Sequence, residues 1–473
     1  MPGYLNLPLC GDAKSILAAV PNESIDACVT DPPYGLTTNP NMPALLKAWL
    51  AGKPFTFGKS GFMSAEWDNY IPGPDIWKEV YRVLKPGAYA LVFAGSRTQD
   101  LMGLALRLAG FEIKDTLIWC YSSGFPKSPN ISKAIDKAAG AERPVVGTRL
   151  LTGNAAVSTK EKGGTYVVGC PPGPPKILEI TGPATDDAKR WDGWGTSLKP
   201  ANEPIFLAQK PFEGSYVENV LRHGTGALNI AASRVGDEVM KFQQFGRSSL
   251  FGNGGEGVSE GEGEVTGRWP ANVILECICE DSKDGHGDCC PAAVLDEQID
   301  PNIKFGASRY FKQIYHKKAP GSERWSWCET CGCVVHSSAV SDHEDHERTF
   351  HPTQKPVDLM RYLIKLVTQP GGVVLDPFGG AFSTAVAAKT DGYHFVSCDL
   401  MEAHVKIGEA RLGAVGRADS DTLHVGAVLC PGCRDRGEIK MIEKAAIEHA
   451  KARARKVTCV KCLGRWEPEE LLP

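Results

Sequence analysis

The chain carries the stretch Gly372-Val373-Val374-Leu375-Asp376-Pro377-Phe378-Gly379-Gly380, in which an apolar run ends in a glycine-containing turn. The sequence predicts a helix over residues 382–389 and a second strand over residues 393–398, which ends at Asp399. A glycine turn between a strand and a helix lets a ligand approach the backbone and the helix N-terminus. An acidic residue about twenty positions later can accept hydrogen bonds from a ribose hydroxyl pair. The stretch predicts a βαβ unit of the nucleotide-binding kind, which alone does not identify the ligand.

A second motif, Asp31-Pro32-Pro33-Tyr34, closes the apolar run over residues 25–30, which predicts a short buried strand. The Asp31 carboxylate and the Pro32 carbonyl can hold both N–H groups of an exocyclic amine and leave its lone pair aimed at an electrophilic methyl group. The prolines fix φ and thus the carbonyl directions. Tyr34 offers a ring on which a base removed from its duplex can stack. The motif favours methylation of a planar base, and the alternative is a Pro-Pro turn after an edge strand, covered by the tyrosine.

Together the two motifs resemble the DNA amino-methyltransferases that use S-adenosylmethionine, in the permuted order in which the catalytic tetrad precedes the cofactor loop. The resemblance covers about residues 5–125 and 345–412. It includes Leu9-Cys10-Gly11-Asp12 and His351-Pro352-Thr353-Gln354-Lys355-Pro356. Two further segments, at residues 197–204 and 224–230, are similar to phage and prophage members.

The resemblance implies roles for individual residues. The catalytic tetrad would be Asp31, Pro32, Pro33 and Tyr34. The cofactor would be bound by Asp12 at its adenine, by Lys355 in the segment around its methionine moiety, and by Asp376, Pro377, Phe378, Gly379, Gly380 and Asp399. One departure concerns Phe382, which stands where the family usually has the last glycine of the loop. This residue would either alter the helix start or narrow the pocket.

The resemblance also implies a reaction, the transfer of a methyl group from S-adenosylmethionine to the N6 amine of a flipped-out adenine in double-stranded DNA. Adenine is favoured because an Asp at the first tetrad position, here Asp31, is more often associated with adenine N6, and a Ser with cytosine N4. The alternatives are a cytosine-N4 methyltransferase, an RNA or protein methyltransferase, and a catalytically silent DNA-binding module. No separate general base is required, because the amine can lose its proton after transfer. The chain shows no nuclease motif.

The implied fold is a Rossmann-like, seven-stranded, mainly parallel sheet with helices on both faces, assembled from both ends of the chain. Strands are expected over residues 27–30, 89–94 and 116–120, and amphipathic helices over residues 76–83 and 98–109. The expected domains are a catalytic half (1–125), a target-recognition insert (126–325), a cofactor-binding half (326–425) and a zinc-ribbon-like module (426–473).

The composition limits the partners and the compartment. The formal net charge of the 473-residue chain is -4, so a DNA footprint must be a local basic surface. Candidate contacts in the middle region are Arg143, Arg149, Arg190, Lys199, Arg222, Arg234, Arg247, Arg268 and Arg309, although most such residues are solvated surface charges. No leading apolar segment has the length of a signal peptide or membrane span. The sequence favours the cytoplasm of a bacterium or a phage-infected cell, with double-stranded DNA as partner and a homodimer as an option.

The 16 cysteines suggest structural zinc in a reducing compartment. Cys430, Cys433, Cys459 and Cys462 form two C-x2-C pairs, a strong tetrathiolate pattern. A second group contains Cys328 and Cys331, with Cys333 beside them. Its ligand set stays open: Cys277 with Cys279, or Cys289 with Cys290, or His343 with His346 would complete it. The alternative is a set of reduced thiols in packed positions.

Overall fold

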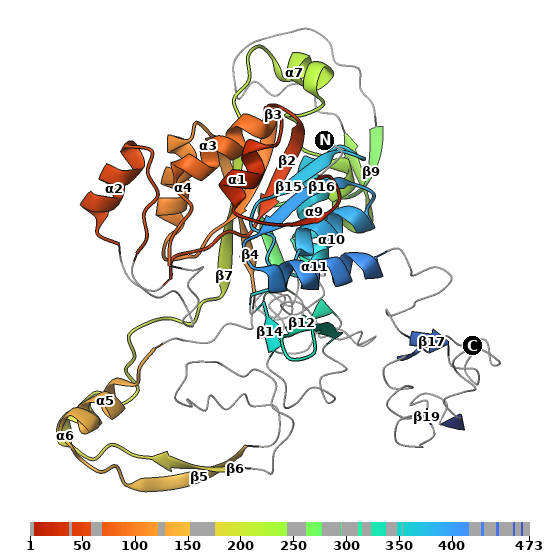
Figure 1. Cartoon of the computed structure of the whole chain (residues 1–473). Coiled ribbons are helices and arrows are strands. Elements are labelled where there is room, and N and C mark those ends of the chain that lie inside the picture. The colour runs from red at the N-terminus through yellow and green to blue at the C-terminus, as the bar shows by residue number, and fades with distance from the viewer. Residues whose placement is uncertain are drawn as a thin grey trace.

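The computed structural model describes residues 4–36, 40–57, 69–121, 128–151, 176–243, 262–276, 295, 311–314, 323–336, 348–351, 353–415, 427–429, 441–443, 457–458 and 465–466. Its main feature is a sheet in the order β1-β16-β15-β2-β3-β7-β4-β10-β11 (Figure 1). The strands are β1 (Pro8–Cys10), β2 (Ile25–Thr30), β3 (Leu84–Phe93), β4 (Glu112–Cys120), β7 (Asn202–Gln209), β10 (Val273–Glu276), β11 (Lys312–Ile314), β15 (Val373–Asp376) and β16 (His394–Asp399). All neighbours are parallel except β7, which is antiparallel to β3 and β4.

The two ends of the chain join in this sheet, as the sequence predicted. Strand β2 lies beside β15, with Ala27 opposite Val374, and β1 lies beside β16. The Asp26 carboxylate strengthens the seam because it accepts a hydrogen bond from the Val373 amide at 2.7 Å. All six residues of β2 are buried, which explains why Ala27, Cys28 and Val29 are apolar in succession instead of alternating with exposed polar residues.

The sheet has nine strands rather than the predicted seven. The extra strands β10 and β11 extend the edge beyond β4. Both come from the stretch 126–325, which was expected to form a separate insert, and so does β7 in the interior of the sheet. The predicted number of strands followed from the family resemblance, and the sequence carries no signal for strands whose pairing partners are remote along the chain. The division into domains stays a prediction.

Helices cover both faces of the sheet. On one face pack α1 (Ala13–Ala18), α2 (Met42–Leu50), α3 (Pro74–Val83) and α4 (Gln99–Leu108), around the buried side chains of Trp49, Trp77 and Leu84. On the other face pack α9 (Val357–Val367), α10 (Ser383–Thr390) and α11 (Glu402–Ala414), around Phe93, Leu363 and Phe395 (Figure 1). These two apolar cores hold the ends of β2 and β15 in place.

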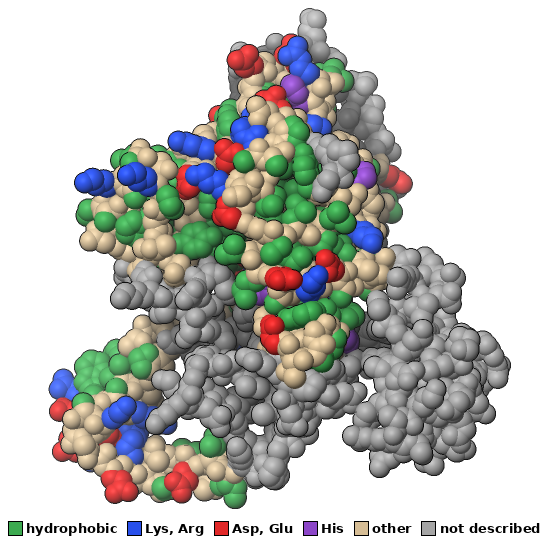
Figure 2. All heavy atoms as spheres, viewed as in Figure 1, with side chains coloured by type: hydrophobic (Ala, Val, Ile, Leu, Met, Phe, Trp, Pro, Cys, Tyr) green, Lys and Arg blue, Asp and Glu red, His purple; other side chains and the backbone are tan. Residues whose placement is uncertain are grey.

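A hairpin arm extends from the sheet (Figure 1). It consists of α5 (Ile131–Ala138), β5 (Val145–Leu151), β6 (Lys176–Thr181) and α6 (Asp186–Arg190). Asp136 fastens the arm internally, because its carboxylate accepts hydrogen bonds from the amides of Ala184 and Thr185, each at 3.0 Å, and pairs with Arg143. Figure 2 shows hydrophobic side chains beside Lys and Arg on this arm, and Trp191 and Trp194 are exposed there.

The remaining described elements surround the sheet. They are α7 (Tyr216–His223), a 3-10 turn (Ala231–Ser233), the pair β8 (Val235–Gln243) and β9 (Glu262–Arg268), and two short pairs, β17 (Ala427–Leu429) with β18 (Met441–Glu443) and β19 (Val457–Thr458) with β20 (Arg465–Trp466). A three-stranded sheet of β12 (Trp325–Cys328), β13 (Cys333–His336) and β14 (Arg348–Phe350) contacts α11. No helix in the described part of the chain combines the length and apolar character needed to cross a membrane.

Candidate active site

The two sequence motifs meet at one cleft. Asp31 follows β2 and the glycine loop follows β15, so both leave the same edge of two adjacent parallel strands. The cleft is lined by Asp31, His351, Thr353, Gln354, Lys355, Met360, Asp376, Phe378, Gly379, Gly380, Ala381, Ser383 and Thr384. The carboxyl edge of parallel strands is the usual place for a ligand in such sheets.

Asp376 is a buried acid at the base of the cleft. Its side chain accepts hydrogen bonds from the Thr30 hydroxyl at 2.7 Å and from the Phe378 amide at 3.2 Å. Burial raises the pKa of Asp376 to about 6, although the hydrogen bonds of Thr30 and Thr384 oppose that rise. Asp376 therefore links β2, the glycine loop and α10 through one carboxyl group.

The glycines of the loop are required by close contacts. A Cβ atom on Gly379 would lie 2.8 Å from the Ser397 hydroxyl, and a Cβ on Gly380 would lie 2.7 Å from Nε2 of His351. Gly380 also has a φ of +51, a conformation that residues with side chains rarely adopt. Its amide donates a hydrogen bond to Asp399 Oδ2 at 2.9 Å. The glycines thus let the loop pack closely against Ser397 and His351, and the acid at the end of β16 holds it.

Phe382 starts α10 in the left-handed conformation, with φ 60 and ψ 33. Its ring is fully buried and lies against Gly408 of α11, where a Cβ would come within 2.5 Å of the ring. Phe382 does not line the cleft. The positive φ of Phe382 explains why glycine suits this position, and the expected effect on the helix start stays a prediction.

Two acids lie at the ends of β16 and β1, where the cofactor residues were expected. Asp399 accepts hydrogen bonds from the Met401 amide at 2.9 Å and pairs with Nδ1 of His404 at 3.0 Å. Burial would raise the pKa of Asp399, but these contacts lower it, so the acid stays ionised. Asp12 caps α1 through the Ser15 amide at 2.9 Å.

Tyr70 lies near the acids Asp12, Asp399 and Asp75, and the sequence carries no signal for it. Burial, followed by the carboxylates of Asp12, Asp399 and Asp75, raises the pKa of Tyr70 to about 12. Its phenol thus stays protonated beside three acids. The concentration of negative charge here suits a ligand that carries positive charge or hydroxyl donors.

Asp31 belongs to a buried group that we call the charged cluster, made of Asp31, Tyr34, Glu203 and Lys355. The Lys355 ammonium donates to Asp31 and lies 3.2 Å from the Glu203 carboxylate. The Tyr34 hydroxyl donates to Asp31 at 2.6 Å and lies 3.2 Å from Glu203. Only 6% of the Lys355 side chain is exposed, against 17% for Asp31 and 12% for Glu203. Two acids therefore share one lysine at the edge of the cleft.

The pKa values of the charged cluster follow from this arrangement. Burial raises the pKa of Asp31; the Lys355 charge opposes the rise and the Glu203 charge adds to it. Burial would lower the pKa of Lys355, but the two carboxylates raise it. Burial and the same acids raise the pKa of the Tyr34 hydroxyl well above its usual value. The lysine is thus held charged, and the ionisation of Asp31 depends on it.

The rest of the tetrad is well positioned. Pro32 and Pro33 are buried, while Tyr34 is half-buried and packs against the core. The Tyr34 carbonyl accepts a hydrogen bond from the Thr98 hydroxyl at 2.8 Å, which fixes the turn. His351 is half-buried, and desolvation together with the neighbouring His404 lowers its pKa to about 3. It is therefore neutral near pH 7.

Sequence reasoning missed Glu203 as a site residue. It lies at the start of β7, which brings it to Asp31 although 172 residues separate them, as the difference of the two numbers shows. A charged residue at the beginning of an apolar strand was the available signal, because a buried carboxylate requires a partner. The His404 partner of Asp399 was also missed, and one histidine on a helix carries no comparable signal.

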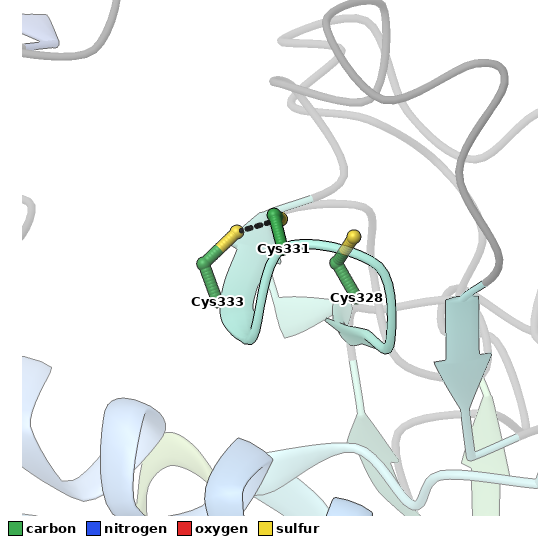
Figure 3. A group of neighbouring side chains, drawn as sticks. All are labelled: Cys328, Cys331 and Cys333. Atoms are coloured by element: carbon green, nitrogen blue, oxygen red, sulfur yellow. Dashed lines mark hydrogen bonds between the residues drawn. The ribbon is translucent and has the colours of Figure 1, made fainter.

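The predicted metal ligands are only partly within the described residues. Cys328, Cys331 and Cys333 gather at the tip of the β12–β13 hairpin (Figure 3). Cys430, Cys433, Cys459 and Cys462 lie outside the described residues, as do Cys277, Cys279, Cys289, Cys290, His343 and His346. The C-terminal zinc pattern stays a prediction from spacing.

The candidate DNA contacts divide into two groups. Arg149, Arg190, Lys199 and Arg222 are exposed. Arg143 and Arg268 are engaged in ion pairs with Asp136 and Glu238, and Arg234 donates to the Gly267 carbonyl at 3.0 Å. Arg247 and Arg309 lie outside the described residues. The structure thus separates free surface cations from those that hold the fold together.

Comparison with known proteins agrees with the geometry of the cleft. A model of the DNA methylase family matches residues 25–410. The type II methyltransferase M.HindIII of Haemophilus influenzae is 35% identical over 413 residues, 83% of this chain and 90% of that protein. YhdJ of Escherichia coli K12, named a DNA adenine methyltransferase, is 36% identical over 73 residues, 15% of this chain and only 25% of its own length.

Among solved structures, the cytosine-N4-specific PvuII DNA methyltransferase aligns over 87% of this chain and 89% of its own, with 13% identity and a TM-score of 0.40. At that score the likeness adds no argument, and the assignment depends on the sequence matches. The extent of the family match and the near-complete coverage of M.HindIII show that this chain belongs to the DNA methylase family, the N4/N6 methyltransferases.

Proposed function

We propose that the protein transfers a methyl group from S-adenosylmethionine to the N6 amine of adenine in DNA. The observation that carries the proposal is the shared cleft, in which Asp31 and the glycine loop leave adjacent strands side by side. For in-line transfer, the residue that accepts the amine hydrogens must face the loop that binds the cofactor, because the reacting atoms have to be held close and aligned.

The residues of the cleft fit S-adenosylmethionine. The glycine loop lines the cleft, and Gly379 and Gly380 let it pack against Ser397 and His351 where side chains would collide. Asp399 would accept from the ribose hydroxyls, and Asp12 would lie at the adenine. When bound, the cofactor supplies an electrophilic methyl group on a sulfonium. The acids of this region complement its positive charge.

The charged cluster would receive the target base. Asp31 and the Pro32 carbonyl would accept the two amine hydrogens, and the ring of Tyr34 would offer a stacking surface. In the structure the Lys355 ammonium donates to Asp31, so the amine of the base must replace the ammonium as a hydrogen-bond donor to this carboxylate. Asp31 or water would accept the proton that the amine loses after transfer.

Analysis of the methylated base tests the choice of adenine. The preference rests on Asp31 at the first tetrad position, and the name of YhdJ agrees with it. DNA treated with the protein and labelled cofactor should yield N6-methyladenine on digestion to nucleosides and mass spectrometry. N4-methylcytosine as the only methylated nucleoside would replace adenine by cytosine and keep the reaction class.

A variant of Asp31 tests the tetrad. Asp31→Asn keeps the size of the side chain but removes its charge and presents an N–H group to the amine. Methyl transfer should be lost, while calorimetry should show cofactor binding close to that of the wild type. Asp115→Asn, at an exposed position of β4, is the matched control. Full activity of Asp31→Asn would contradict the assignment of the tetrad.

DNA is the proposed substrate rather than RNA or protein. The exposed cations Arg149, Arg190 and Lys199 of the middle region are available to contact phosphates, on a chain that is acidic as a whole. Labelled methyl transfer to duplex DNA, RNA and protein lysate should favour DNA. If the chain bound no cofactor at all, a silent DNA-binding module would be the better description.

A C-terminal zinc site is a second part of the proposal. Cys430, Cys433, Cys459 and Cys462 would close a tetrahedral site, which can hold together a unit too small to be stabilised by burial. The spacing of the two C-x2-C pairs is the support for it.

A further inference from the structure

Three cysteines converge at the tip of the hairpin formed by β12 and β13. Cys328 ends β12, Cys333 begins β13 as its register partner, and Cys331 lies in the turn between them. The three Sγ atoms lie within 4.8 Å of one another (Figure 3), and those of Cys331 and Cys333 are 2.8 Å apart. Three soft donors thus face one point in space.

The turn that joins them has the form of a metal-binding knuckle. Gly332 has a φ of +64, which lets the chain reverse over the few residues between Cys328 and Cys333. The register of the hairpin alone brings Cys328 and Cys333 together, but it does not require a third cysteine in the turn. Packing explains the buried Cys328, whereas Cys331 is exposed and gains nothing from burial.

We propose that Cys328, Cys331 and Cys333 bind a structural Zn²⁺ ion. Thiolate ligands at this spacing favour zinc, and structural zinc sites are tetrahedral. The sequence offers candidates for a fourth ligand in Cys277, Cys279, Cys289, Cys290, His343 and His346. Cys333 extends the expected pair Cys328 and Cys331, and the register of the hairpin places it opposite Cys328.

The position of the hairpin connects this metal to the cleft. Strand β12 also pairs with β14, with Cys328 opposite Arg348 and Ser326 opposite Phe350. Glu329 in the turn accepts a hydrogen bond from the Thr349 hydroxyl of β14 at 3.0 Å. The chain leaves β14 directly into His351 and, four residues later, Lys355, both of which line the cleft.

The other end of β12 is fastened to the same segment. Glu323, just before β12, accepts the Val357 amide at 3.1 Å through its carboxylate and the Gln354 side chain at 2.8 Å through its backbone carbonyl. Its carboxylate also lies 3.7 Å from Arg411 of α11. The zinc would therefore stabilise the three-stranded sheet of β12, β13 and β14. This sheet holds residues 348–357, and with them Lys355, against the cleft.

Metal content of the full-length protein tests the site. We compare the wild type with a variant in which Cys328, Cys331 and Cys333 are replaced by Ser, and with one in which Cys430, Cys433, Cys459 and Cys462 are replaced by Ser. Elemental analysis should show that the first variant loses about one zinc ion per chain and that the second retains about one. Unchanged zinc in the first variant, or none in the second, would overturn the proposal.

Single substitutions separate ligation from folding. Cys333→His keeps a zinc ligand and should retain the metal, whereas Cys333→Ser should lose it. Cys120→Ser, at a cysteine outside the cluster, is the control and should not change the metal content. Co²⁺ added to the metal-free C-terminal variant should produce the visible absorption of a tetrahedral thiolate site. A Cys331–Cys333 disulfide in the metal-free protein as isolated, without bound zinc, would refute the assignment.

Hydrogen exchange tests the connection to the cleft. A chelator would remove zinc from the variant in which Cys430, Cys433, Cys459 and Cys462 are replaced by Ser. Amide exchange in residues 348–357 should then become faster, because the metal no longer holds their sheet together. Exchange in β3, on the other side of the cleft, should stay unchanged. Equal exchange with and without zinc would overturn the coupling. Neither readout depends on methyl transfer, so failure here is distinguishable from failure of the proposed enzyme activity.

Discussion

At the scale of single residues, the charged cluster controls whether Asp31 can accept a hydrogen bond from an amine. Asp31 must be ionised to accept from both directions, and its burial opposes ionisation. Lys355 and Glu203 act on it with opposite signs. The lysine at the edge of the cleft therefore sets the charge of Asp31, and its expected contact with the cofactor stays a prediction.

This opposition predicts two shifts of the pH dependence in opposite directions. Lys355→Met removes the charge that lowers the pKa of Asp31, so the acid limb of the kcat/KM profile should move to higher pH. Glu203→Gln removes the charge that raises it, so the limb should move to lower pH. In both variants the Tyr34 hydroxyl still faces Asp31. Methyl transfer measured from about pH 5 to 9 checks this; shifts of the same sign would contradict it.

Asp376 gives a prediction about stability. Its pKa is about 6 in the folded protein and near 3.8 when unfolded. Between these values the folded state binds more protons, so the contribution of Asp376 to stability falls as pH rises from about 4 to 6, by about 3 kcal/mol. In Asp376→Asn the side-chain oxygen can still accept from Thr30, and this residue no longer lowers the free energy of unfolding as the pH rises. The difference in the free energy of unfolding between variant and wild type should grow in favour of Asn across that range, as measured by denaturant titration at each pH.

A constant difference between the two proteins from pH 4 to 6 would show that Asp376 does not bind the extra proton. Asp115→Asn, which replaces an exposed acid, serves as the control for general effects of charge on stability.

At the scale of the element, the start of α10 stores backbone strain. Phe382 has a positive φ, which costs about 1–2 kcal/mol for a residue with a Cβ atom. The packing of its buried ring against Gly408 of α11 offsets this backbone cost. The helix thus begins at a position that suits glycine but is held by an aromatic anchor.

Comparing two truncations of Phe382 separates the strain from the packing. Both Phe382→Ala and Phe382→Gly should destabilise the protein by about 3–5 kcal/mol, because both lose the buried ring. The glycine variant should be the more stable of the two by about 1 kcal/mol, since glycine relieves the positive φ. At Ala385, in the interior of the same helix, Ala→Gly should instead cost about 1 kcal/mol. Thermal and denaturant unfolding of the variants would reveal this; an alanine variant more stable than the glycine variant would contradict it.

At the scale of the whole molecule, cofactor binding should stabilise both ends of the chain together, because the cleft is built from both. S-adenosylmethionine at 100 times its Kd should add about 2.7 kcal/mol to the free energy of unfolding. Asp399→Asn should weaken binding roughly ten- to hundredfold, since a hydrogen bond to a charged group is worth about 1.5–3 kcal/mol. Thermal shift and calorimetry measure both effects. Unaltered affinity of Asp399→Asn would remove the ribose contact from the proposal.

Local patterns explain which parts of the fold were predictable. The strand at residues 25–30 and the helix α3 have an apolar periodicity that is visible within a few residues. The place of β7 between β3 and β4 was not predictable in that way, because its partners lie about a hundred residues away in sequence. The same reason hid β10 and β11, which are short and follow a stretch rich in glycine.

The sequence by itself determined the chemistry at the ends of two strands: the acid and rigid carbonyl of the tetrad, the glycines of the loop and the acid at Asp399. Residue type and short spacing carry that information, because each motif acts through its own backbone. The tertiary structure alone decided that Glu203 and Lys355 surround Asp31. Burial and charge interactions depend on which side chains meet in space, and the chain brings these three together from segments far apart along its length.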